Sequence, residues 1–351
     1  MKKEVKNSRK IVVILGPTAT GKSDLAVKIA KKIGGEIISA DSRQVYKGLD
    51  IGTGKITKKE MRGVSHHLLD VISPRKQFTA SDFVRLSRPK ISEIFGRGHT
   101  PIICGGAGFY ISTLLGEWPT PEVPPNKKLR DRLSKKSVPQ LFLILKKLDL
   151  KRAKTIDTKN PVRLIRAIEI AKTLGQVPPI HRNPKGTPEG NTRNTLGLFQ
   201  YSQEYWNSKL MMGEMLGEMH IEKIGLDFSD KELKKRIALR LEKRLKQGMI
   251  KEARSLHARG LSWKRMERLG LEYRSLARLL QNKISRKEFE KELLKETWAY
   301  AKRQRTWWRK DKEIKWVNST NAMELLSKFT TLDVVNLVAD LCRNKNAGHK
   351  S

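Results

Sequence analysis

Residues 11–23 read IVVILGPTATGKS, a short apolar and mostly β-branched run followed at once by a glycine-rich loop that ends in Lys-Ser. The apolar run is typical of a strand buried in a parallel sheet. The loop at 16–23 fits the G-x-x-x-x-G-K-[ST] pattern, in which backbone N–H groups and the N-terminus of the next helix hold phosphate oxygens. A chance glycine turn is the competing interpretation, but the loop stands between a strand and a helical pattern. We therefore predict an α/β fold with a phosphate-binding loop.

Each position of this loop has a predicted role. Lys22 is expected to reach a terminal or bridging phosphate, and the Ser23 hydroxyl is expected to coordinate Mg²⁺. The pattern does not distinguish ATP or another nucleotide from a different diphosphate. The predicted diphosphate- or nucleotide-binding residues are Gly16, Pro17, Thr18, Ala19, Thr20, Gly21, Lys22 and Ser23.

Strands and helices alternate through the N-terminal third of the chain. Apolar residues at helical spacing predict a helix over 22–33, and EIISAD at 36–41 predicts a second strand. A helix over 82–95, kinked at Pro89, precedes a third strand at 101–104. This alternation predicts a P-loop parallel sheet, doubly wound with helices on both faces.

The character of the chain changes at WPTPEVPP, residues 118–125. Helices are predicted over 230–258, 264–281 and 286–309, and Ser229 with Glu232 predicts a capping box at the first of them. We predict four regions: the first part of the P-loop core at 1–118; a helical insertion at 119–220 with a variable segment at 182–218; a returning core strand and C-terminal helices at 221–320; and a polar tail at 321–351.

The charge indicates a polyanionic partner. Among 351 residues, 73 Lys and Arg stand against 36 Asp and Glu, a net charge of +37. Nucleic acid fits best, because neutralising backbone phosphates releases counterions; an anionic membrane surface or a ribosome-associated role is the alternative. The two cysteines lie far apart, which predicts a reducing compartment. No signal peptide or membrane-spanning stretch is evident, so we expect a cytoplasmic protein.

Two carboxylates are candidates for chemistry. Asp41 follows the second strand, at the carboxyl edge of the sheet, where it would bind magnesium, act as a base or simply cap a turn. Asp70 is a second carboxylate of this kind. His66 and His67 are adjacent and point in different directions, so a metal site there is not favoured.

Beyond the loop, a series of motifs resembles the bacterial tRNA dimethylallyltransferase family, also called tRNA isopentenyltransferases. The motifs are GPTATGKS (16–23), ADSRQVYKGLDIGTGK (40–55), HHLLDV (66–71), GGAGFYI (105–111), NPVRLIRAIE (160–169), RIALRLEKRLKQG (236–248), LGLEYR (269–274) and AKRQRTWWR (301–309). They run in family order and cover roughly residues 11–310. A lone P-loop is generic, whereas the motif at 40–55 followed by the one at 301–309 is specific to this group.

The resemblance implies transfer of a dimethylallyl group from dimethylallyl diphosphate to N6 of adenosine 37 in tRNA, with release of diphosphate. Asp41 would act as the base on the adenine amine. Lys22, Mg²⁺ and either Arg236 or Arg240 would stabilise the departing diphosphate. The protein would be a monomer that contacts the anticodon stem-loop.

The resemblance also implies a set of tRNA contacts, of which the insertion would supply part. For each arginine among them the simpler interpretation is a solvated helix face. The set is Asp41, Ser42, Arg43, Gln44, Ala107, Arg130, Val162, Arg163, Leu164, Ile165, Arg166, Arg268, Tyr273, Arg274, Lys302, Arg303 and Gln304.

The chain departs from the family at Ala107, where a threonine is usual, and losing that hydroxyl is expected to slow the reaction by about one or two orders of magnitude. Two other functions fit a P-loop: a small-molecule kinase, or a transferase that prenylates free adenine nucleotides. An RNA-binding protein with an inactive site is a further alternative. The charge of +37 argues against a small-molecule enzyme, and the intact Lys22, Ser23 and Asp41 argue against an inactive one.

Overall fold

The computed structural model describes residues 10–118, 121, 123–178 and 219–318. The chain forms two compact units, Met1–Leu114 with Glu218–Ser351, and the intervening Leu115–Gly217. The variable segment predicted at 182–218 and the tail predicted at 321–351 lie outside the described residues. Within the described residues, no helix is long and apolar enough to cross a membrane.

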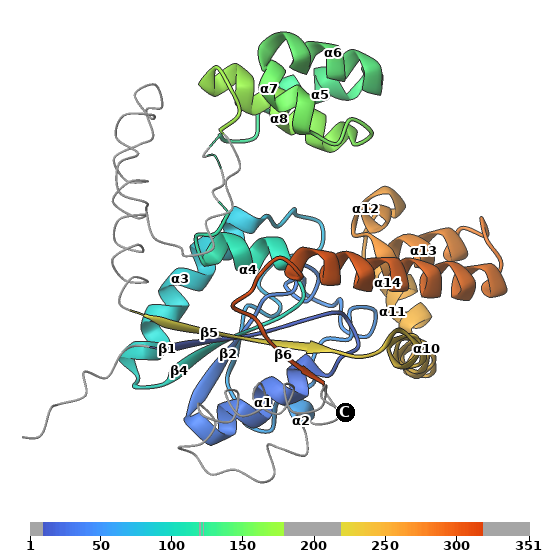
Figure 1. The fold of residues 1–351 in the computed structure, drawn as a ribbon. Coiled ribbons are helices and arrows are strands. Elements are labelled where there is room, and N and C mark those ends of the chain that lie inside the picture. Colours follow the sequence, from blue (N-terminus) through green and yellow to red (C-terminus); the bar gives the residue numbers. More distant parts are fainter. Residues whose placement is uncertain (1–9, 119–120, 122, 179–218, 319–351) are drawn as a thin grey trace, which may run out of the picture. The chain divides into compact units, whose positions relative to one another are not determined.

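The first unit is built on a parallel sheet, as the sequence predicts, and the sheet has six strands, of which β3 and β6 were not predicted (Figure 1). β1 pairs with β4 on one side, where Val12 lies opposite Ile102, and with β5 on the other, where Ile14 lies opposite Ile224. The strand predicted to return after the insertion therefore lies beside the first strand. The strands are β1 (Lys10–Leu15), β2 (Gly35–Ser39), β3 (His66–His67), β4 (Thr100–Cys104), β5 (His220–Asp227) and β6 (Lys315–Asn318), in the order β3-β2-β4-β1-β5-β6.

Helices cover both faces of the sheet. The apolar stripe of α1 (Lys22–Ile33) packs through Leu25 and Ile29 on Ile14 and its neighbours, which excludes water from one face. Figure 1 shows α3 (Ala80–Gly96) and α4 (Gly108–Leu114) on the opposite side of the sheet from α1. Pro89 lies within α3, and the short α2 (Lys58–Met61) follows β2.

In the described part of the chain, five helices follow β5, two more than predicted. They are α10 (Asp230–Lys246), α11 (Met249–Ala258), α12 (Trp263–Arg268), α13 (Leu271–Leu280) and α14 (Arg286–Trp308). The helix predicted over 230–258 ends before Gly248, and the one over 264–281 ends before Gly270; both glycines have positive φ, 95° and 79°, which a right-handed helix excludes. The predicted capping box is half formed: Ser229 caps α10, but the Glu232 carboxylate lies 3.7 Å from Arg236.

The second unit has its own apolar core, formed by α5 (Lys127–Ser134), α6 (Val138–Leu148), α7 (Leu150–Thr155) and α8 (Pro161–Leu174). Leu141, Leu145, Leu164 and Ile168 are fully buried in it. A polar side chain caps the first turn of each helix, which satisfies backbone N–H groups that would otherwise lack a partner. Local sequence thus accounts for both the ends and the packed faces of these helices.

Candidate active site

The phosphate loop joins β1 to α1, and both of its glycines have a positive φ. Gly16 has a φ of 138°, and a Cβ there would lie 2.1 Å from the carbonyl oxygen of Leu226 on β5. Gly21, with a φ of 86°, precedes the first turn of α1. The two glycines thus shape the turn that leads into α1, where the helix dipole favours an anion.

Lys22 is the cation of this loop. Its Nζ donates a hydrogen bond to the carbonyl of Pro17. Burial lowers the pKa of Lys22 to about 8, and the charge of Arg240 acts in the same direction, against the attraction of Asp41. A diphosphate bound beside Lys22 would stabilise the charged ammonium, which burial disfavours.

The loop forms one wall of a cavity of about 1070 Å³, which is large enough for a diphosphate and a second group such as a nucleobase. Every residue of its lining belongs to the first unit. The lining includes Thr18, Lys22, Ser23, Asp41, Arg43, Gln44, Cys104, Arg236, Arg240, Arg244, Glu272, Arg274, Tyr300, Arg303 and Gln304.

Asp41 lies two residues after β2, where the carboxyl ends of the strands meet the cavity. Its Oδ1 accepts hydrogen bonds from the backbone N–H groups of Arg43 (2.8 Å) and Gln44 (3.3 Å). These bonds form a turn that fixes the carboxylate at the cavity. Asp41 therefore both caps this turn and lines the cavity, two roles that the sequence analysis gave as alternatives. Asp70 instead pairs with Lys55, at 2.5 Å.

Three arginines of α10, at positions four residues apart, line the cavity, and two of them contact the phosphate loop. Arg236 Nε donates to the carbonyl of Ala19 (3.0 Å), and Arg240 Nη1 donates to Thr18 Oγ1 (2.8 Å). Arg244 donates to the Thr53 carbonyl (3.0 Å). Both arginines predicted from the sequence therefore contact the phosphate loop, and Arg244 adds a third guanidinium to the cavity lining.

α14 supports the same loop from another direction. Gln304 Oε1 accepts from the N–H of Thr18 (2.8 Å), and its Nε2 donates to the carbonyl of Gly106 (2.8 Å). Gln304 is 5% exposed, so its polar atoms serve the protein itself. Arg303, one residue earlier in the helix, is exposed and lines the cavity.

The other predicted tRNA-binding residues of the first unit divide by exposure. Ser42, Arg43, Gln44 and the exposed Arg274 line the cavity. Arg268 and Lys302 are exposed outside the cavity lining. Tyr273 needs a correction as a side-chain contact: it is 1% exposed, and its hydroxyl donates to Glu252 at 2.6 Å. Ala107 lies at the start of α4, where its carbonyl accepts from Tyr110 and Ile111 and no side-chain hydroxyl is present.

In the second unit, Arg130 and Arg166 both hydrogen-bond the buried Glu169, so part of their charge is already neutralised. Leu164 is fully buried in the core, which corrects its prediction as a side-chain contact for tRNA. Val162 and Arg163 are exposed, and Ile165 is half-buried. These three exposed or half-buried positions, with the half-buried Arg166, lie in the N-terminal part of α8 (162–166).

Three residues of the cavity were not predicted from the sequence: Arg244, its partner Glu272, and Tyr300. Arg244 Nη1 donates to Glu272 at 3.1 Å. Burial raises the pKa of Tyr300, and Asp41 acts in the same direction. The spacing of Arg244 from Arg240 was the one available signal, since residues four apart share a helix face.

The oxygen donors around the cavity suit Mg²⁺ rather than a transition metal. Ser23 and Asp41 both line it, and magnesium takes one or two protein oxygens together with phosphate oxygens. Across 10–118, 123–178 and 219–318, no group of three or more His, Cys, Asp or Glu residues could hold a metal ion. His66 and His67 contact Val64 and Glu36 instead.

Comparison with known proteins agrees with this geometry. A family model described as IPP transferase matches residues 44–311, and one described as isopentenyl transferase matches residues 9–78. The chain belongs to the IPP transferase family. The match covers the turn after Asp41, the insertion and the helices that carry the cavity arginines.

Relatives within the IPP transferase family align over most of their length. The chain is 38% identical over 311 residues to tRNA dimethylallyltransferase 2 of Treponema denticola, covering 87% of this chain and 95% of that protein. It is 37% identical over 316 residues to tRNA dimethylallyltransferase 1 of Syntrophus aciditrophicus, covering 88% and 93%. A crystal structure of the tRNA isopentenylpyrophosphate transferase of Bacillus halodurans has the same fold, with a TM-score of 0.62, 29% identity, and coverage of 96% and 99%.

Proposed function

We propose that this protein transfers the dimethylallyl group of dimethylallyl diphosphate to N6 of adenosine 37 in a tRNA and releases diphosphate. The observation that carries the proposal is the convergence of the phosphate loop, Lys22, three arginines and the Asp41 carboxylate in one cavity. Its relatives in the IPP transferase family are named as tRNA dimethylallyltransferases. A small-molecule kinase would not need so strongly basic a chain, which carries a net charge of +37.

At the diphosphate end, the bond from the allylic carbon to oxygen breaks and the electron pair leaves with the diphosphate. The loop amides, Lys22 and Arg240 stabilise the charge that develops there. Magnesium, held by the Ser23 hydroxyl and the diphosphate oxygens, would neutralise part of the same charge. These groups face an anion that grows during the reaction, so they favour the transition state over bound substrate.

At the other end, N6 of the adenine forms the new bond to carbon and loses a proton. The lone pair of this amine is delocalised into the ring, so a base beside it assists the attack. Asp41 takes the proton in our proposal, with its carboxylate held by the turn at Arg43 and Gln44. The adenosine must leave its stack to enter the cavity, which is least costly in a single-stranded loop.

Exposed cations supply the attraction for tRNA. Arg43, Arg274 and Arg303 lie around the cavity. On the second unit, α5 and the turn after it expose Lys127, Lys128, Arg132, Lys135 and Lys136. Because these charges face backbone phosphates rather than bases, tRNA binding should weaken steeply with salt. We place the reaction in the cytoplasm, where tRNA is available.

The test is to incubate the purified protein with Mg²⁺, labelled dimethylallyl diphosphate and an unmodified tRNA carrying A36-A37-A38, then digest the tRNA and look for prenylated adenosine. Asp41→Asn keeps the shape of the side chain and should bind tRNA normally without transfer. Product from the wild type also shows that Ala107 is tolerated. Product on free AMP with none on tRNA, or ATP turnover with no prenylation, would replace the proposal with a small-molecule function.

A further inference from the structure

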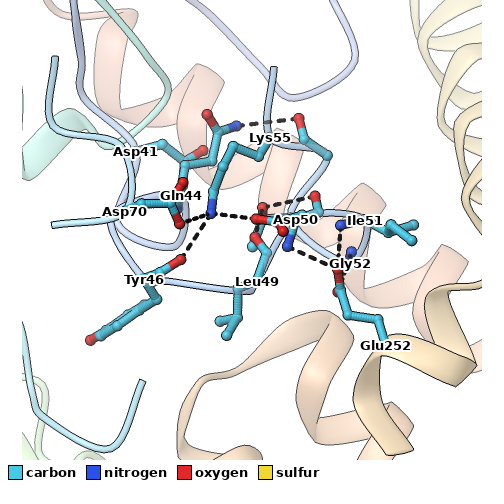
Figure 2. Close-up of polar contacts among 12 residues, drawn as sticks. Asp41, Gln44, Tyr46, Leu49, Asp50, Ile51, Gly52, Lys55, Asp70 and Glu252 are labelled. Carbon is cyan, nitrogen blue, oxygen red and sulfur yellow. Dashed lines mark hydrogen bonds and ion pairs between the residues drawn. The ribbon is translucent and has the colours of Figure 1, made fainter. Parts of the chain in front are cut away.

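One carboxylate outside the cavity collects four hydrogen bonds from the segment beside it. Glu252, on α11, accepts from the backbone N–H groups of Asp50 (2.9 Å), Ile51 (2.7 Å) and Gly52 (2.9 Å), as Figure 2 shows. Its fourth donor is the Tyr273 hydroxyl. Three successive N–H groups around one anion form a rigid turn, because each would need another partner if the carboxylate left.

The residue after this turn meets the arginines of the cavity. The carbonyl of Thr53 accepts from Arg240 (3.3 Å) and from Arg244 (3.0 Å). Thr53 is itself held by the bond from its hydroxyl to the Leu49 carbonyl, at 2.6 Å. At Gly54, a Cβ would lie 2.4 Å from an Nη2 atom of both arginines, so the backbone lies directly against both guanidiniums.

The second anchor of the segment is Lys55. Its Nζ contacts the Tyr46 carbonyl (2.9 Å), Asp50 (2.6 Å) and Asp70 (2.5 Å), and its side chain is 6% exposed (Figure 2). The turn at 50–52 is therefore held by two side chains: Lys55 pairs with Asp50, and Glu252 of α11 accepts from the three backbone N–H groups. Glu252 links the turn to α11, and the Tyr273 side chain of α13 lies against Gly52 in the same turn.

Resting on the proposed function, we infer that Glu252 is a positioning residue for the diphosphate site. The backbone N–H groups bound by Glu252 fix the orientation of the Thr53 carbonyl, which follows them in the chain. This carbonyl accepts hydrogen bonds from Arg240 and Arg244 and so keeps both guanidiniums at the cavity. Arg240 completes the path through its bond to Thr18 Oγ1. A carboxylate that never touches substrate would thus set the affinity for diphosphate while leaving the affinity for tRNA unchanged.

The test measures binding of inorganic pyrophosphate with Mg²⁺ by calorimetry, which requires no transfer reaction. Glu252→Gln keeps the shape but places an NH₂ group against backbone donors. We expect its Kd for pyrophosphate to rise about tenfold with the Kd for unmodified tRNA unchanged. In the transfer assay, the KM for dimethylallyl diphosphate should rise while that for tRNA stays constant.

Two further variants make the result specific. Gly54→Ala moves the two guanidiniums without touching Glu252 and should give the same pattern. Glu290→Gln changes a half-buried helix glutamate that pairs with Arg286, and should leave both Kd values unchanged.

A Glu252→Gln protein with wild-type pyrophosphate affinity and a lower midpoint of unfolding would overturn the inference, because the carboxylate would then serve stability alone. An equal loss of pyrophosphate and tRNA affinity would also overturn it. A wild-type protein that binds no pyrophosphate would refute the proposed function itself, which distinguishes that failure from the first two.

Discussion

Replacing Gln304 with methionine keeps the length of the side chain but removes both hydrogen bonds that connect α14 to the phosphate loop. The Thr18 N–H and the Gly106 carbonyl, each 2.8 Å from Gln304, lose their partner. A buried polar group left unpaired costs about 1–3 kcal/mol. Gly106 is buried, whereas water can reach the half-buried Thr18, so we expect the free energy of unfolding to fall by about 2–4 kcal/mol.

Urea unfolding of Gln304→Met, followed by fluorescence, measures this loss. Arg303→Met is the matched control, since Arg303 precedes Gln304 in the same helix but is exposed at the cavity. The control should keep its stability and bind tRNA more weakly, while Gln304→Met should do the reverse. If Gln304→Met kept wild-type stability and bound tRNA poorly, Gln304 would face tRNA and the bracing role argued here would be wrong.

Three other changes have defined outcomes. Because the pKa of Lys22 is lowered to about 8 and a bound diphosphate favours the ammonium, pyrophosphate affinity should fall as the pH rises above about 8; Lys22→Arg, titrated in the same buffers, should remove this dependence, and parallel profiles would contradict the assignment. Glu169→Gln leaves Arg130 and Arg166 without their carboxylate and should destabilise the second unit by about 1–3 kcal/mol in urea unfolding, a loss that an unchanged transition would exclude. Gly16→Ala places a Cβ against a backbone carbonyl of β5 and should abolish pyrophosphate binding; calorimetry showing normal affinity would mean that the loop relaxes freely.

Local signals were sufficient to predict the core of the fold. β1, the phosphate loop and α1 follow from the consecutive residues 11–33, because an apolar run, a glycine-rich turn and a helical repeat need no distant partner to be recognised. The breaks at Gly248 and Gly270 were not predicted. The apolar spacing continues across each of them, and it does not reveal the positive φ of the two glycines at which the helices break.

The site was predictable in type but not in the partners of each residue. The motif at 301–309 marks Gln304 as important, yet its hydrogen bond to Thr18 joins residues 286 positions apart, which no local pattern reveals. Tyr273 was likewise assigned to tRNA binding because it belongs to a motif, the one at 269–274. Its hydroxyl instead donates a hydrogen bond to Glu252. A motif identifies which residues a fold requires; whether an atom faces a ligand or another part of the protein depends on contacts between distant segments.

The order of the strands has a consequence for synthesis of the chain. β1 pairs with β4 and β5, and β5 begins at His220, long after β4 ends at Cys104. At about 5–20 residues per second on the ribosome, roughly ten seconds pass between the synthesis of β4 and that of β5, and one edge of β1 stays unpaired during this interval. The intervening helices have their own apolar core and can collapse during that interval. A nascent chain stalled before residue 220 should therefore carry a folded inserted unit beside an open strand edge, the kind of surface that chaperones bind.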